Sequence, residues 1–261
     1  LASFALGLAG CGGGSGGGSD TPPPPPPPPI TKAEAFQLLN QATFGATEAE
    51  AQRVIDMRFE AWIDEQLAQP ASLQLPHVQS LPLPQFIGEL QNDRVDIWFR
   101  NALLGDDQLR QRVAFALSEI MVVSQLGVLN NYPYALASYY DTLARNAFGN
   151  YRDLIEEVTL HPAMGVYLSM LGNEKPDPAN NIRPDENYAR ELMELHTLGV
   201  EGGYTQEDVM QLARCLTGWT VKHHFYRGQF TFDAEHHDDA SKQVLGLRVP
   251  AGLEQRGAEQ V

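Results

Sequence analysis

Two glutamates three residues apart, Glu191 and Glu194, are the side chains whose type and spacing best suit chemistry. On a helix they would lie about 60° apart around the axis, so both carboxylates would share one face. Paired carboxylates can bind a metal ion or divide the roles of acid and base between them. Asn187 and Arg190 lie on the same predicted face and complete the candidate catalytic set.

The same face has a simpler interpretation, which is a ladder of ion pairs on a solvent-exposed helix. Arg190 lies four residues after Glu186 and four before Glu194. Each pair at this spacing stabilises a helix by about 0.2–0.5 kcal/mol. We favour this structural interpretation and keep the paired-carboxylate site as the alternative.

His196 follows the two glutamates and invites comparison with a di-iron site. Such sites need Glu and His three residues apart, whereas His196 lies five residues after Glu191 and two after Glu194. We therefore expect His196 to be a packing residue at the edge of the apolar stripe of this helix. That stripe consists of Tyr188, Ala189, Leu192, Met193 and Leu195.

A second cluster, of histidines and aspartates, lies nearer the C-terminal end. These residue types can ligate a transition metal, but neighbours on a strand point to opposite sides and seldom bind one ion together. We favour a solvated polar loop and name His237 and Asp238 as the first candidates for metal ligands. The sequence contains no G-x-S-x-G, H-E-x-x-H or phosphate-binding glycine motif, and it clearly implies no cofactor. The cluster consists of His223, His224, Asp233, His236, His237, Asp238 and Asp239.

The two cysteines have separate roles. Residues 1–8 are apolar and uncharged, and the sequence Leu-Ala-Gly-Cys at 8–11 resembles the lipobox of bacterial lipoproteins. An apolar segment this short does not span a bilayer and is typical of a signal peptide. We expect Cys11 to carry the lipid, with residues 1–11 as the remnant of the signal. Cys215 would then be alone, as a buried and inert thiol in no disulfide.

A spacer of low complexity occupies residues 12–30. Residues 12–19 are Gly and Ser, which form flexible coils, and residues 22–29 are eight prolines. A polyproline II rod of that length reaches about 25 Å. We expect a disordered tether that holds the domain away from a membrane to which the lipid on Cys11 binds it. Gly12 after the lipidated cysteine favours the outer membrane, if the organism is Gram-negative.

The formal net charge is −15, and almost all of it lies beyond residue 20. An acidic surface repels the phosphates of nucleic acids, which excludes DNA and RNA as partners. It also repels anionic lipid headgroups, so membrane attachment should come from the anchor and not from the domain.

Helices must position most of these residues. Capping-box spacing occurs at residues 31–34 and 47–50, and apolar residues at helical spacing follow both. Prolines predict an irregular connection over residues 71–84. Further helices are predicted at 59–69, 85–104, 106–124, 134–148, 150–160, 162–171, 184–198 and 205–216.

The rest of the chain is predicted to be a loop and a hairpin. Residues 172–183 are polar and contain two prolines, which indicates a surface loop. Alternation of apolar residues from Trp219 to Phe232 predicts a β-hairpin. The fold class is therefore mostly α: a multi-helical array over residues 31–261 with a small β-hairpin near the C-terminal end.

An ordered series of motifs resembles a large bacterial family, the domain-of-unknown-function family 1800, over roughly residues 31–250. The resemblance implies export and, often, genomic pairing with a secreted protein similar to sulfatases and alkaline phosphatases. It implies no established activity. Family members usually have a further helical half, so we expect this chain to be a fragment, incomplete at its C-terminus and also at its N-terminus. The motifs are NYARELMELHTLG at 187–199, LNQATFG at 39–45, GYTQEDV at 203–209, ARCLTGW at 213–219, and the pairs His237-Asp238 and Leu245-Gly246.

Two functions follow as hypotheses. The first is a cell-envelope lipoprotein that binds or supports a secreted partner protein, for which the family resemblance points to the phosphatase- or sulfatase-like one. The alternative is an extracytoplasmic metal-assisted hydrolase that uses the 187–194 helix and the His237-Asp238 loop. We favour the first, because no recognised catalytic motif is present.

Overall fold

The structure is a computed structural model, and it describes residues 27–221, 230–253 and 256–257. These residues are mostly helical, as predicted. The expected signal remnant with Cys11 and most of the expected tether lie outside the described residues, as does the predicted apex of the hairpin. The α-helices in chain order are α1 (Lys32–Ala42), α2 (Glu48–Met57), α3 (Phe59–Ala68), α4 (Leu75–Ser80), α5 (Leu90–Leu104), α6 (Gln108–Ile120), α7 (Pro133–Arg145), α8 (Tyr151–Thr159), α9 (Pro162–Tyr167), α10 (Asn187–Glu191) and α11 (Gln206–Cys215).

Shorter elements complete the array. Two 3-10 turns, η1 (Ile87–Glu89) and η2 (Gly127–Asn131), precede α5 and α7, and a π-helical turn, η3 (Leu192–Thr197), continues α10. The strands form two antiparallel pairs, in which Trp219 faces Phe232 and Gln243 faces Arg248. The first pair is the base of the predicted hairpin. The strands are β1 (Trp219–Thr220), β2 (Thr231–Phe232), β3 (Lys242–Val244) and β4 (Leu247–Val249).

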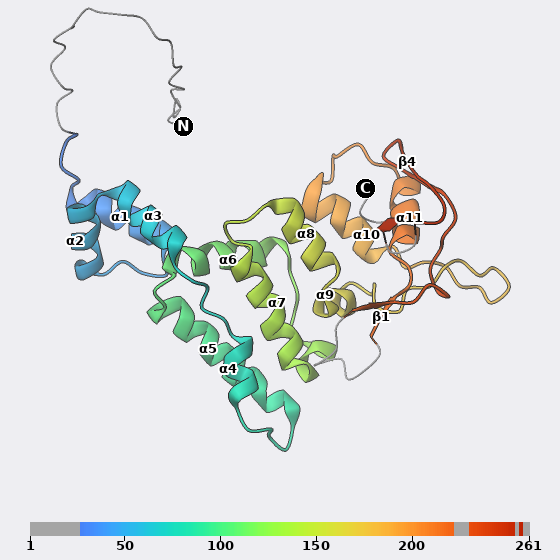
Figure 1. Ribbon diagram of the computed structural model, residues 1–261, viewed down its shortest axis with the longest axis horizontal. Helices are drawn as coiled ribbons and strands as arrows, with labels where there is room; N and C mark the ends of the chain where they lie inside the picture. The colour runs from blue at the N-terminus through green and yellow to red at the C-terminus, as the bar shows by residue number, and fades with distance from the viewer. Residues whose placement is uncertain (1–26, 222–229, 254–255, 258–261) are drawn as a thin grey trace, which may run out of the picture.

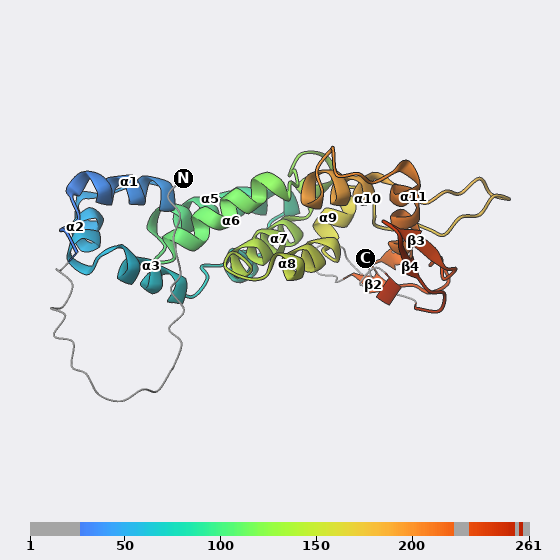
Figure 2. The same ribbon diagram turned by 90° about the horizontal axis from the view of Figure 1, so that it is seen from above.

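The elements follow one another along a single long axis (Figure 1). Helices α1 to α3 lie at one end, α4 to α8 form the middle, and α10 and α11 lie with the strands at the other end, an arrangement that the second view also shows (Figure 2). The loop at residues 172–183 projects from this last part, as predicted, and is closed by a bridge between Asp177 and Ile182.

The first helices show how local hydrogen bonding fixes the start of the domain. Thr31 and Glu34 form the predicted capping box. The second predicted box is only half formed, since Thr47 accepts from the backbone of Glu50 but the Glu50 carboxylate accepts from Nε1 of buried Trp62 at 2.6 Å. The Glu50 carboxylate, which would complete the capping box, therefore binds the indole of Trp62 instead.

The predicted irregular connection over residues 71–84 is wrong in part, because it contains α4. Pro76 lies in the first turn of this helix, where the missing N–H costs no hydrogen bond. Asp141 of α7 accepts the backbone N–H groups of Gln74 and Leu75 at 2.7 and 2.9 Å. A buried carboxylate from a distant helix therefore holds the start of α4 in place.

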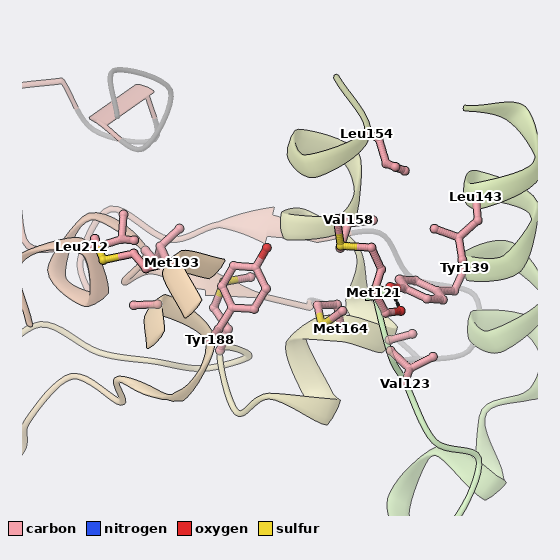
Figure 3. Close-up of a cluster of buried hydrophobic side chains, with 14 of the residues drawn as sticks. Met121, Val123, Tyr139, Leu143, Leu154, Val158, Met164, Tyr188, Met193 and Leu212 are labelled. Atoms are coloured by element: carbon pink, nitrogen blue, oxygen red, sulfur yellow. Dashed lines mark hydrogen bonds between the residues drawn. The ribbon is translucent and has the colours of Figure 1, made fainter. Parts of the chain in front are cut away.

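The largest core joins the middle of the molecule to its C-terminal part (Figure 3). Figure 3 shows Tyr139 and Leu143 of α7 at one side of this cluster and Tyr188 and Met193 at the other. The Tyr139 hydroxyl donates to the carbonyl of Met121 at 2.7 Å, which satisfies a polar group in an apolar setting. Because this core includes residues of α10, η3 and α11, it fixes the helices that carry the candidate site.

Within the described residues, no helix combines the length and the apolar character that crossing a bilayer requires.

Candidate functional site

The helix that carries the paired glutamates changes its hydrogen-bonding pattern midway. It begins at Asn187, three residues later than predicted, and continues as the π turn η3 from Leu192. In this turn the backbone N–H of Leu198 donates to the carbonyl of Met193 at 2.8 Å, five residues back. The Thr197 hydroxyl donates to the carbonyl of Leu192 at 2.6 Å, also five residues back. Such π turns occur frequently at functional sites.

The wider turn alters which side chains face the core. Leu195, predicted on the apolar stripe, is 59% exposed, and that prediction is wrong. His196 is 5% exposed and packs with its ring centroid 6.2 Å from that of Tyr188, as expected for a packing residue. Burial lowers the pKa of His196, so its ring is neutral at pH 7. The π turn explains why His196 is buried and Leu195 is exposed. A π turn contains about one residue more than the 3.6 residues of a regular helical turn, so the side chains that follow it shift by one position.

The predicted ion-pair ladder is half formed. Arg190 pairs with Glu186 at 3.0 Å and also donates to Oε1 of Gln206 at 2.8 Å. The predicted second pair does not form among the described residues, since the Glu194 carboxylate accepts instead from the Tyr204 hydroxyl at 3.3 Å. The side chain of Gln206 donates to Glu186 at 2.6 Å and closes a three-residue network between α10 and α11.

The two candidate carboxylates are half-buried, and Asn187 is exposed. Glu191 has neither a hydrogen bond nor an ion pair with any residue that the structure describes. No group of three His, Cys, Asp or Glu side chains within the described ranges is arranged to hold a metal ion. Glu191 and Glu194 therefore stand as neighbouring carboxylates without a third ligand from that part of the chain.

His237 and Asp238 are both held against the C-terminal end of α11. His237 is 3% exposed, and its Nδ1 lies 2.8 Å from the carbonyl oxygen of Thr217. Asp238 forms a buried ion pair with Arg214, with 2.6 Å between Oδ2 and Nε. The Lys242 ammonium donates to the backbone carbonyl of Asp238. The side chains of His237 and Asp238 are thus engaged by partners within the fold.

Burial, together with the charges of this ion pair, shifts the pKa values of the groups around it. Burial alone would raise the pKa of Asp238, but the hydrogen bond and charge of Arg214 hold it below its ordinary value. Burial lowers the pKa of Lys242, and it raises the pKa of the Cys215 thiol to about 11. Cys215 is therefore a protonated and weakly nucleophilic thiol at pH 7, as predicted from its sequence context.

Both sequence motifs touch α11, but at opposite ends. Arg190 contacts the helix at Gln206, and Asp238 contacts it at Arg214. Eight residues of α-helix separate the two contacts by about 12 Å along the axis. The structure therefore brings both motifs to the same helix, at two separate points.

A groove that sequence reasoning did not find lies between α8, η3 and α11. Its volume is about 500 Å³, and its walls are mostly apolar. Trp219 closes one side of it with a side chain that is 8% exposed, and the indole Nε1 has no hydrogen-bond partner among the described residues. No sequence signal marks this groove, because its walls come from segments that are far apart along the chain.

A second surface feature lies over α5 and α6, and we call it the aromatic face. It consists of Phe44, Trp98, Phe99 and Phe115. The rings of Trp98 and Phe99 have centroids 4.9 Å apart, and those of Phe44 and Trp98 are 5.7 Å apart. Phe99 is 52% exposed. The Arg112 guanidinium lies over the rings of Phe44 and Phe115 at 5.4 and 5.7 Å.

A hollow of about 360 Å³ opens in the aromatic face beside Trp98 and Phe115. Arg94 lines it and is only 5% exposed. Its guanidinium donates to the side-chain carbonyls of Gln91 and Gln125 at 2.9 and 2.7 Å, and it has no carboxylate partner among the described residues. Burial lowers the pKa of Arg94, which marks the cost of holding this charge without a counter-charge.

Comparison with known proteins gives one match. The model of a family described as "Protein of unknown function (DUF1800)" matches residues 37–261. No curated protein and no solved structure matches the chain.

Proposed function

The chain belongs to the DUF1800 family of proteins of unknown function, and on that premise we propose that it is a lipid-anchored envelope protein that binds a secreted partner through its aromatic face. The observation that carries the proposal is a set of exposed and partly exposed aromatic rings beside the buried Arg94, which has no counter-charge in the described part of the chain. The lipobox at Cys11 and the proline-rich spacer support export and anchoring.

The composition of the face is that of a binding hot spot. Aromatic residues and arginine are enriched where partners bind, and exposed apolar patches mark interaction sites. Phe99 offers an exposed ring supported from behind by Trp98, so it is held in place before a partner arrives. A ring that is already ordered loses little conformational entropy on binding.

The hollow specifies the chemistry of the partner. Its lining is mixed: Val95 and Val122 offer apolar contacts for a side chain of the partner, and Ser118 and Glu119 are polar. Arg94 at its wall has no carboxylate partner among the residues that the structure describes. A partner segment that carries an apolar residue next to an acidic one satisfies both conditions, since a charge-assisted bond to a buried guanidinium is among the stronger hydrogen bonds. The partner class implied by the family resemblance is the secreted phosphatase- or sulfatase-like protein.

Replacement of Phe99 by alanine tests the face. We expect F99A to weaken binding of the purified phosphatase- or sulfatase-like protein by about 30-fold, because a central aromatic anchor contributes about 2 kcal/mol. The matched control is V200A, since Val200 is 68% exposed and lies outside the face. Biolayer interferometry with the immobilised full chain measures both affinities. Equal affinities for F99A and V200A, or no binding by the wild-type chain, would refute the proposal.

Lipidation of Cys11 is tested separately. We expect the mature chain to begin at a diacylglyceryl-modified Cys11, with the membrane fraction losing the protein in C11S. Mass spectrometry of the N-terminal peptide and labelling with radioactive palmitate measure the modification. C215A is the control that keeps the label, because Cys215 is buried. An unmodified N-terminus on a cytosolic chain would contradict anchoring and would leave the test of the aromatic face unaffected.

A further inference from the structure

The hollow in the aromatic face contains a charged donor that the fold leaves available. Arg94 is 5% exposed and lines the hollow together with Trp98 and Tyr140. A guanidinium has five N–H groups, and two of them are used, since Nε donates to Gln91 and Nη2 donates to Gln125. Nη1 has no partner among the described residues and keeps accessible surface. The unused part of the guanidinium can therefore reach a ligand in the hollow.

The charge of Arg94 is costly to hold in this place. A buried ion without a counter-ion is destabilising, because the protein interior solvates it less well than water does. Gln91 and Gln125 offer only neutral carbonyl oxygens. Glu119 also lines the hollow, but it is exposed and forms no ion pair with Arg94. A carboxylate on a bound molecule would supply the missing charge, through hydrogen bonds about twice as strong as neutral ones.

The rest of the lining fits a small apolar acid. The volume of the hollow, about 360 Å³, lies at the lower end of the range of about 300–1,000 Å³ typical of ligand pockets. Val95, Val122 and Trp98 offer apolar walls. Tyr140 has its ring centroid 5.4 Å from Cζ of Arg94, and no hydrogen bond joins its hydroxyl to another described residue. The hollow thus combines a charged donor and a neutral donor with apolar walls.

The charge of the surroundings favours a ligand with one negative charge over a ligand with two. The formal net charge of the chain is −15, and the exposed Glu119 is part of the lining. A phosphate or a dicarboxylate would be repelled by both, with only Arg94 in the described lining to offset the repulsion. We propose that the hollow binds a small monocarboxylate whose apolar body is about the size of an aromatic side chain, with the carboxylate on Arg94.

The acid would compete with the proposed protein partner for Arg94. This consequence rests on the proposed function, because the acidic residue of the partner uses the same guanidinium. Added acid should therefore lower the affinity for the phosphatase- or sulfatase-like protein. A partner whose affinity stays unchanged at saturating acid would contradict its contact with Arg94 and not the acid site. Titrations of the chain alone decide the acid site separately.

Two probes of the same shape test the charge. 4-Phenylbutyrate carries the carboxylate, and 4-phenylbutanamide has a neutral amide in its place. In calorimetric titrations of the full chain, we expect the acid to bind about tenfold more tightly than the amide, which corresponds to about 1.4 kcal/mol. In R94M, which keeps an apolar stem in place of the arginine, the two affinities should become equal. Circular dichroism shows whether that variant is folded.

The place of binding is tested without altering Arg94. V122E puts a carboxylate in the lining at a side chain that is 44% exposed, and it should weaken the acid at least about fivefold and the amide much less. V128E is the matched control, since Val128 is 61% exposed and lies outside the lining, and both affinities should stay unchanged.

A direct readout in the wild-type chain is the indole ¹⁵N resonance of Trp98. It should move with the acid, while the resonances of the other two tryptophans, which lie outside the lining, should stay in place. The site would be overturned by any of four results: no binding of either probe, equal affinities for acid and amide in the wild-type chain, a preference for the acid that survives in R94M, or equal effects of V122E and V128E.

Discussion

Replacing Asp238 with alanine is expected to lower the free energy of unfolding by about 3 kcal/mol, because one partner of a buried ion pair is then missing. Arg214 would remain charged without its partner, and its side chain is only 23% exposed. The variant also loses the acceptor for the backbone N–H of Ala240 at 3.0 Å. Removing one partner of a buried pair costs about 3–5 kcal/mol, and the partial exposure of Arg214 places this case at the lower end. Urea titration of the full chain, followed by circular dichroism, measures the loss.

Two further variants separate the ion pair from the loop that carries it. E235A changes an exposed residue of the same loop and should alter stability by less than about 0.5 kcal/mol. The double variant R214M/D238A should be more stable than the sum of the two single losses predicts, because it leaves no unpaired charge. Additive losses would show that Asp238 and Arg214 do not stabilise each other.

Whether D238A lowers or raises the free energy of unfolding also decides between a structural role and a metal-binding role for Asp238. Functional carboxylates are commonly held at a cost to stability, so that replacing them makes a protein more stable. A structural Asp238 predicts the opposite, namely a large loss. If D238A proved more stable than wild type, the metal-assisted hydrolase would become the better hypothesis for this end of the chain.

Acidification from pH 7 to pH 4.5 is expected to cost the wild-type chain about 2.5 kcal/mol of stability through His161 alone. His161 is 8% exposed, and its Nδ1 accepts the backbone N–H of Ala163 at 3.1 Å at the start of α9. Burial, with a smaller contribution from the charge of Arg145, lowers its pKa to about 4. The unfolded chain takes up a proton near pH 6.5 while the folded chain takes it up near pH 4, so stability is complete above pH 6.5 and falls as the pH drops.

The matched variant is H161N, because asparagine also accepts a backbone N–H at a helix start but does not titrate. Urea titrations at pH 7 and pH 4.5 should show a smaller loss for H161N than for wild type, by about 2.5 kcal/mol. Other titrating groups are common to both chains and cancel in this difference, including Asp141, whose pKa burial raises to about 6. Equal losses in the two chains would show that folding does not shift the pKa of His161.

Local signals were sufficient to predict much of the fold. The helices that became α5, α6, α7 and α11 have long apolar periodicity, and the structure places them within a few residues of the expected bounds. The short helix α4 was missed because its start is fixed by Asp141, which lies more than sixty residues further along the chain. Contacts of that kind leave no trace in a local pattern.

The candidate site was less predictable for the same reason. The sequence placed Glu191 and Glu194 on one helix, but it gave no sign of the π turn that follows them, because the turn depends on how η3 packs on the core. The sequence favours a solvated polar loop around Asp238, and this prediction is wrong at His237 and Asp238, which are both buried. The sequence could not show this, because the ion-pair partner Arg214 is distant along the chain. The aromatic face could have been suspected from Trp98 and Phe115 at the positions of two successive predicted helices, yet only their approach in space makes it a surface.

The π turn also constrains how this part of the chain can vary. A π turn amounts to one surplus residue held inside a helix, and losing that residue would restore regular geometry. The side chains beyond it would then keep their present faces, with His196 still against the core. We infer that deletion of the exposed Leu195 is tolerated better than deletion of the buried His196. Substitutions at Leu195, which is exposed, should be far more freely accepted than those at its buried neighbour.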